Sequence, residues 1–222
     1  MALRDLLGVR PGVTAVIGGG GKTTLLRTLG GELAAEGKRV LLCTTTKMLP
    51  FPDLPCALTG AELEALRRKH RLLCAGTLLP DTGKLAAPET PMAQLAARFD
   101  YMLVEADGAA RRPLKAHAPH EPVIPAEANQ TICVVGASGF GQPIVQAAHR
   151  PERYAALAGV PETAEATPET EAAVLRAEAL HTRIYVNQVE TLWELADAKA
   201  LAALLECPVL AGSLQRGEYF SC

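Results

Sequence analysis

Aromatic residues are scarce in this chain: Phe, Tyr and Trp make up 4% of its 222 residues. That is too few for a surface on which successive bases stack, as single-stranded nucleic-acid binders require. A basic excess is also missing, because 22 Lys and Arg face 24 Asp and Glu, for a formal net charge of −2. General nucleic-acid binders carry such an excess. We therefore expect no nucleic acid among the partners.

Long apolar runs and paired cysteines are missing as well. No run approaches the roughly 20 residues of a membrane span, and Arg4 and Asp5 break the N-terminal apolar residues, unlike a signal peptide. Six cysteines are scattered without a Cys-x-x-Cys pair, so we expect reduced core thiols and no structural zinc. These absences indicate a cytoplasmic globular protein with no membrane partner, which we expect to form a single domain over residues 1–222.

What the chain does have is an alternation of short apolar runs and helical patterns. Leu25, Leu29 and Leu33 share one face of a helix expected over 22–36, and Gly37 is placed to stop it. Thr59 opens a capping box for a helix that runs to about Lys69. Two further helices are expected over 168–179 and 191–205. Strands are expected over 13–17, 39–43, 71–74, 101–105, 130–135, 182–187 and 208–211.

This order predicts an α/β fold of the P-loop NTPase type, with three α/β/α layers and a mostly parallel sheet. A small hairpin is expected over 77–87, and residues 50–91 around it look like an insertion or a lid. In such folds ligands bind at the carboxyl ends of the strands. The residues that follow each predicted strand are therefore the candidates for chemistry.

The strongest of these candidates is a glycine-rich loop between the first strand and the first helix. It consists of Gly18, Gly19, Gly20, Gly21, Lys22, Thr23 and Thr24. Glycine backbone N–H groups and a helix N-terminus together favour a phosphate. Lys22 would then reach the β- and γ-phosphates, and the Thr23 hydroxyl would bind Mg²⁺. The full P-loop pattern needs a glycine where Val16 stands, so the usual loop geometry does not follow.

Two further strand ends carry polar residues that suit a magnesium–phosphate site. The strand over 101–105 runs into Glu105 and Asp107, two residues apart, which would hold Mg²⁺ or orient water. Thr45 and Lys47 follow the strand over 39–43, where switch-type loops lie. A polar turn is an equally good interpretation of the Thr44–Lys47 segment.

A run of cations follows the acidic strand end. Arg111, Arg112 and Lys115 suit a second anionic substrate or the γ-phosphate, and Arg111 is the candidate that acts in catalysis. A solvated run of charges is the alternative. His117 and His120 form a His-x-x-His pair off a helix, which is a poor metal site.

The strand over 182–187 ends in a pattern similar to the Asn-Lys-x-Asp base-recognition motif of GTPases. Asn187 stands in the Asn position, Gln188 replaces the Lys, and Glu190 replaces the Asp. The similarity places these three residues at the nucleotide base and leaves the choice between ATP and GTP open.

Together these segments resemble the YqeC-type proteins. The resemblance covers most of the chain and rests on Gly18–Thr24, Thr44–Met48, Glu105–Lys115, His120–Pro125 and Asn187. It implies an accessory protein, dependent on Mg²⁺ and ATP or GTP, that assists maturation of a selenium-dependent molybdenum hydroxylase. The implied partners are that hydroxylase or its cofactor-maturation proteins.

Two other functions remain open at this stage. The loop is also similar to the short loop of Mur-type ligases, which suggests a kinase or ligase acting on a small anionic substrate. A nucleotide sensor without turnover is the third hypothesis. Many such NTPases also complete their sites across a homodimer, although no residue of this chain indicates one.

Overall fold

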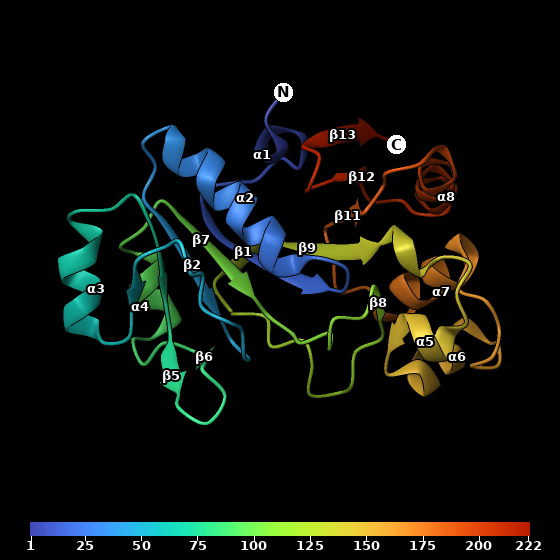
Figure 1. The fold of residues 1–222 in the computed structure, drawn as a ribbon, viewed down its shortest axis with the longest axis horizontal. Coiled ribbons are helices and arrows are strands. Elements are labelled where there is room, and N and C mark those ends of the chain that lie inside the picture. The colour runs from blue at the N-terminus through green and yellow to red at the C-terminus, as the bar shows by residue number, and fades with distance from the viewer. The chain divides into compact units, whose positions relative to one another are not determined.

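The computed structural model describes all residues from 1 to 222 and shows two compact units. Unit 1 comprises residues 1–16, 23–108 and 123–130, and unit 2 comprises residues 17–22, 109–122 and 131–222. The elements of both are labelled in Figure 1.

Unit 1 contains a parallel sheet. Its strands, in spatial order, are β1 (Gly12–Gly18, of which residues up to Val16 belong to this unit), β7 (Tyr101–Glu105), β2 (Val40–Thr44), β4 (Leu72–Ala75) and β3 (Cys56–Ala57). All four pairings are parallel. Strands β1 and β2 follow each other along the chain but are not neighbours in the sheet. Strand β7, which comes later in the chain, lies between them. Val16 and Thr44 both lie in register with Glu105.

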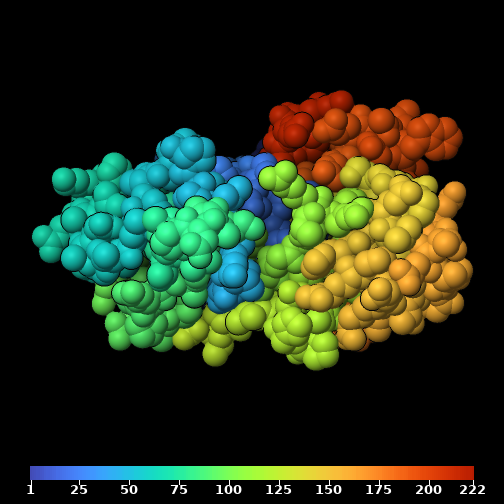
Figure 2. Space-filling view, turned by 60° about the horizontal axis from the view of Figure 1, so that its bottom comes forward, coloured from blue at the N-terminus to red at the C-terminus, as the bar shows by residue number.

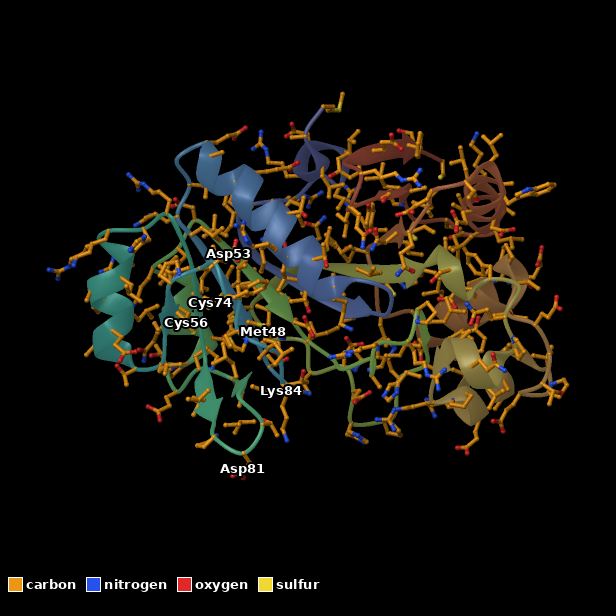
Figure 3. All side chains as sticks on the ribbon, viewed as in Figure 1. Met48, Asp53, Cys56, Cys74, Asp81 and Lys84 are labelled. Atoms are coloured by element: carbon orange, nitrogen blue, oxygen red, sulfur yellow. The ribbon has the colours of Figure 1, made fainter.

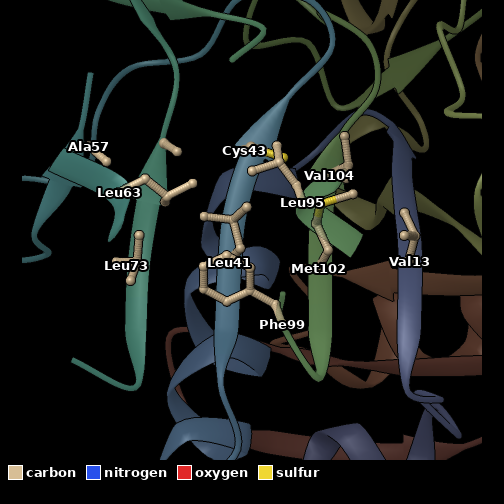
Figure 4. Packing of buried hydrophobic residues seen from close by; sticks show 11 residues of the cluster. Val13, Leu41, Cys43, Ala57, Leu63, Leu73, Leu95, Phe99, Met102 and Val104 are labelled. Carbon is tan, nitrogen blue, oxygen red and sulfur yellow. The ribbon is translucent and has the colours of Figure 1, made fainter. Parts of the chain in front are cut away.

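Helices cover both faces of this sheet. Alternation along each strand sends successive side chains to opposite faces. The face with Leu41, Leu73 and Met102 packs against α3 (Gly60–Arg67) and α4 (Met92–Ala96) in the apolar cluster of Figure 4. The opposite face meets α2 (Lys22–Ala35), where Gly30 allows close approach to Leu42 and Leu72. The predicted three layers are therefore present in unit 1.

Helix α2 follows the predicted pattern to its end. Leu25, Leu29 and Leu33 are each at most 1% exposed. Gly37 adopts a φ of +79°, and its N–H bonds the carbonyl of Ala34 while that of Lys38 bonds Leu33. These two bonds form a Schellman motif, which satisfies carbonyls that the helix end leaves unpaired.

The segment after β2 holds both sheet elements and the predicted hairpin. Strands β3 and β4, which are connected by helix α3, extend the parallel sheet. Strands β5 (Thr77–Leu79) and β6 (Lys84–Ala86) form a separate antiparallel pair. The hairpin tip lies at the surface, in mint green in Figure 2. Thr59 caps α3 as expected, but the Glu62 carboxylate bonds the N–H of Leu58 and so leaves the predicted capping box incomplete.

Unit 2 contains β9 (Ala128–Gly136, from Thr131 onward in this unit), β11 (Arg183–Asn187), β12 (Val209–Ser213) and β13 (Glu218–Ser221). The first three are parallel, and β13 adds an antiparallel edge that the sequence pattern did not predict. Helices α7 (Pro168–Glu178) and α8 (Leu192–Ala203) begin with capping boxes at Thr167 and Thr191. These boxes explain why the two helices start where the sequence predicts.

Shorter elements complete the chain. They are α1 (Leu3–Leu6), β8 (Leu114–Lys115), a 3₁₀ turn at Ala137–Gly139, α5 (Ile144–Ala147), β10 (Ala148–His149) and α6 (Pro151–Ala158). Strands β8 and β10 pair with each other in parallel. None of the helices has the length and hydropathy that a membrane crossing requires.

Candidate functional site

The glycine-rich loop, residues 18–21, is tightly enclosed within unit 2. A Cβ at any of its four glycines would come closer than contact distance to neighbouring atoms. At Gly19 the obstacle is the backbone of Arg112 and Pro113, and at Gly20 it is the backbone of Gly136. Gly20 also adopts a φ of +75°, a conformation that L side chains rarely accept. The loop surface is thus formed by backbone, as phosphate binding requires.

The loop is held by hydrogen bonds to neighbouring backbone. The Gly19 N–H donates to the Val134 carbonyl at 2.8 Å, and the Gly20 N–H donates to the Arg112 carbonyl at 3.1 Å. Lys22 is buried, and its Nζ donates to the Gly18 carbonyl at 2.6 Å. Two of the loop amides therefore bond within the protein.

Asn187, at the end of β11, anchors the loop from the side. Its Nδ2 donates to the Gly20 carbonyl at 2.7 Å, and its Oδ1 accepts from the N–H of Leu214 at 3.1 Å. The side chain is buried. Within unit 2, the Asn of the predicted base-recognition pattern therefore helps to fix the shape of the glycine-rich loop.

The other two residues of that pattern have partners of their own. Gln188 has a φ of +66°, and its Oε1 accepts from the Ser138 hydroxyl at 2.7 Å. The Glu190 carboxylate accepts from Ser213 Oγ at 2.9 Å and pairs with Arg216 at 3.3 Å. A base that bonds Glu190 would have to share or displace these partners.

In unit 1, Thr23 and Glu105 come together. The Thr23 hydroxyl donates to Glu105 Oε2 at 2.7 Å, although 82 residues separate them. Glu105 is the last residue of β7 and is buried, and Thr23 lies in the first turn of α2. The structure thus joins the hydroxyl and one of the carboxylates that the sequence predicts as magnesium ligands.

The threonines after β2 support the same strand end. The Glu105 carbonyl accepts from the Thr44 hydroxyl at 2.7 Å and from the Thr45 N–H at 3.1 Å. The Thr45 hydroxyl, a predicted ligand-binding group, donates to the Val123 carbonyl at 2.7 Å. Lys47 is exposed. These threonines therefore brace Glu105 by backbone contacts.

Asp107 and Thr24 are the remaining predicted site residues of unit 1. Asp107 follows β7 by two residues and is buried, and the chain between is fixed because the Ala106 N–H donates to the Val16 carbonyl at 3.0 Å. Thr24 is exposed at the start of α2. Burial of a carboxylate beside a strand end fits a metal-binding or water-orienting group.

The cations after the acidic strand have different environments. Ala110 and Arg111 are exposed and both adopt left-handed backbone conformations, with φ of 47° and 63°. Non-glycine residues in this conformation cluster at functional sites. Arg112 is exposed and its guanidinium bonds the Gln146 carbonyl. The side chain of Lys115, by contrast, is fully buried and pairs with Glu121 at 2.9 Å. The expectation that all three cations meet an anionic ligand therefore does not hold for Lys115.

The histidines do not form a metal site. His117 is buried, and both its backbone N–H and its Nδ1 lie within hydrogen-bond distance of the Glu178 carboxylate, at 2.6 and 2.7 Å. His120 is exposed. The molecule has no group of three or more His, Cys, Asp or Glu side chains that could hold a metal ion.

Near this pair lies a carboxyl with an unusual pKa. Glu171 of α7 is 2% exposed, and burial raises its pKa to about 7, with the Glu178 charge adding to the rise and Tyr154 and His117 opposing it. Burial raises the pKa of Tyr154 as well. Nothing in the sequence pattern marks Glu171 or Glu178, and the partner of Glu178, His117, lies 61 residues away along the chain.

The comparisons with known proteins bear on these residues. The family model of the YqeC protein matches residues 14–152, a stretch that includes the glycine-rich loop, Glu105 and Asp107. The chain is also 35% identical over 159 residues to the uncharacterized protein YqeC of Escherichia coli (strain K12), an alignment that covers 68% of this chain.

This chain belongs to the YqeC family. It spans 62% of the length of that Escherichia coli relative. The model match ends before Asn187, so within this YqeC-family chain the anchoring of the loop by Asn187 is a finding of the structure alone.

Solved structures show weaker similarity. The hydrogenase maturation factor HypB from Archaeoglobus fulgidus matches 98% of this chain and 87% of its own, with 14% identity and a TM-score of 0.44. FtsY from Mycoplasma mycoides matches 96% and 65%, with 12% identity and a TM-score of 0.45. HypB from Helicobacter pylori in complex with nickel matches 92% and 80%, with 11% identity and a TM-score of 0.40. Nothing about function follows at these scores.

Proposed function

We propose that this chain binds a Mg²⁺-nucleoside triphosphate, ATP or GTP, at residues 18–24 and hydrolyses it. The observation that carries the proposal is the 2.7 Å hydrogen bond from Thr23 to Glu105. It brings a hydroxyl and a carboxylate, two oxygen ligands that Mg²⁺ prefers, to the carboxyl end of a parallel strand. Thr23 directly follows Lys22, the predicted phosphate ligand.

The residues present fit both groups. The crowded glycines keep the loop surface free of side chains, which suits close approach of a phosphate. Thr23, Glu105 and Asp107 would hold the metal, and Mg²⁺ when bound would neutralise phosphate charge. The Lys22 ammonium would exchange the Gly18 carbonyl for phosphate oxygens. Asp107 would orient the attacking water, and the exposed Arg111 would stabilise charge on the transferred phosphoryl group.

Within the cell, we propose that this turnover serves maturation of a selenium-dependent molybdenum hydroxylase. Membership of the YqeC family supports this finer assignment, and the partner would be the hydroxylase or one of its maturation proteins. In this proposal the protein acts in the cytoplasm, as a homodimer that forms around the nucleotide.

Calorimetry tests the nucleotide proposal directly. ATP, GTP and their diphosphates are titrated with and without Mg²⁺ into the wild type, Lys22→Ala and the control Lys38→Ala, which removes an exposed lysine. Loss of one charge-assisted phosphate contact costs about 1.5–3 kcal/mol, or about ten- to a hundredfold in affinity. We expect that loss in Lys22→Ala alone.

Unchanged affinity in Lys22→Ala, or no nucleotide binding by the wild type, would refute the assignment. The reaction products distinguish hydrolysis from the two alternative functions, a kinase or ligase and a nucleotide sensor. Nucleoside diphosphate with free phosphate supports hydrolysis, a phosphorylated acceptor supports a kinase or ligase, and tight binding without turnover supports a sensor.

A further inference from the structure

Two cysteines of unit 1 lie opposite each other on adjacent strands. Cys56 in β3 and Cys74 in β4 are direct partners in the parallel ladder, and Figure 3 shows them side by side. Neighbouring strands lie about 4.8 Å apart. That spacing falls inside the Cα separation of roughly 4.4–6.8 Å that a disulfide spans.

Both side chains also point to the same face of the sheet. Ala57, Leu73 and Ala75 belong to the apolar cluster under α3 and α4. Because side chains alternate along a strand, Cys56 and Cys74 point to the opposite face. Both cysteines are free, and hydrogen bonding between the two thiols is the main influence on the pKa of each.

The two thiols differ in access and acidity. Cys74 is completely buried, whereas Cys56 is partly exposed on the last strand of the sheet. The shared hydrogen bond raises the pKa of Cys56 and lowers that of Cys74, whose sulfur also accepts from the Phe51 backbone. Cys43, on neighbouring β2, is buried without such help, and burial raises its pKa to about 12.

We propose that Cys56 and Cys74 are a redox modification site. The two cysteines form a reversible disulfide with each other by thiol–disulfide exchange with small-molecule disulfides such as oxidised glutathione. The Cys56 thiol loses its proton to solvent and attacks one sulfur of the oxidant, and the first small thiolate leaves and takes up a proton. The Cys74 thiol then loses its own proton to solvent and attacks the Cys56 sulfur, which expels the second small thiolate to be protonated in turn. The protein loses two thiol hydrogens, and one disulfide becomes two thiols.

The bond would tie the edge strand β3 to β4. Strand β3 consists of two residues and is held by few backbone bonds, among them the one from the Cys74 N–H to the Pro55 carbonyl at 2.9 Å. The segment Phe51–Pro55, which is the last part of the connection from β2 to β3, would thereby be fixed at its C-terminal end. This inference is independent of the proposed nucleotide chemistry.

Peptide mapping tests the proposal on the intact folded chain. The protein is incubated with oxidised glutathione, its remaining thiols are alkylated, and the digest is analysed by mass spectrometry. We expect two of the six thiols to be lost first, in one peptide pair that joins Cys56 to Cys74 and separates again with dithiothreitol.

Variants provide the controls. Cys74→Ser should stop at a mixed disulfide of glutathione with Cys56, and Cys207→Ser should behave as the wild type. Recovery of Cys56 and Cys74 as alkylated thiols while Cys222 is oxidised would overturn the proposal. So would a wild type in which Cys56 carries glutathione and no cross-link forms. The wild-type map alone is decisive if a variant fails to fold.

Discussion

Unit 1 and unit 2 keep their polar side chains in different places. Unit 1 places Thr23, Thr44 and Glu105 at the carboxyl end of its sheet, and its interior is apolar. Unit 2 buries paired polar side chains outside its main sheet, as with Lys115 of the short strand β8 and Glu121, or His117 and Glu178. The strand-end polar groups converge on one end of the sheet, whereas the buried pairs mainly hold their own segments together. The two kinds of residue look alike in the sequence.

The largest expected effect comes from breaking a buried pair. Glu178→Ala removes the carboxylate that lies within hydrogen-bond distance of the His117 ring and N–H, and each buried hydrogen-bonding group that loses its partner costs about 1–3 kcal/mol. Chemical denaturation measures the loss. The control Glu64→Ala removes two partly exposed ion pairs of unit 1, with Arg67 and Arg98, and we expect a smaller change. Equal losses in both variants would contradict the comparison.

A crowded glycine should matter more than an open one. Gly20→Ala adds a Cβ that collides with Gly136, whereas Gly83→Ala in the β5–β6 turn meets nothing within 4 Å, and both positions have positive φ. The backbone strain alone costs about 1–2 kcal/mol, and overpacking adds about 1–3. Thermal or denaturant unfolding should therefore show the larger loss in Gly20→Ala. Similar losses would mean that the loop has room.

Glu171 should make stability fall as pH rises. Its folded pKa of about 7 lies above the ordinary 4.5, so the folded state binds more protons between these values, and stability decreases from about pH 4.5 to 7. At 1.36 kcal/mol for each pKa unit, the loss is at most about 3 kcal/mol. Glu171→Gln should remove this slope and gain stability over the wild type near pH 8. Parallel wild-type and variant curves would show that Glu171 stays ionised in the fold.

Much of unit 1 could be predicted because its signals are local. The spacing of Leu25, Leu29 and Leu33 predicts α2, and Gly37 marks its end. The apolar strand before Glu105 places that carboxylate at the carboxyl end of the sheet. The hydrogen bond from Thr23 to Glu105 follows once the strands are parallel.

In unit 2, strands β9, β11 and β12 and the starts of α7 and α8 could be predicted, but the partners of the buried polar side chains could not. Lys115 and His117 look like a solvated run, and only the fold brings Glu121 and Glu178 to them. Strand β13 was missed since an edge strand with exposed residues carries no apolar run. Asn187 was found through its similarity to a base-recognition pattern, yet the structure shows it bonded to the loop.

The central claim is that Thr23 and Glu105 act together on a metal-bound nucleotide. A double-mutant cycle of Thr23→Val and Glu105→Gln, read as nucleotide affinity by calorimetry with and without Mg²⁺, tests it most directly. We predict that each variant loses about tenfold or more in affinity with Mg²⁺ only, and that the double variant is hardly worse than either single one. Losses that are additive, or that are equal without Mg²⁺, would contradict the claim.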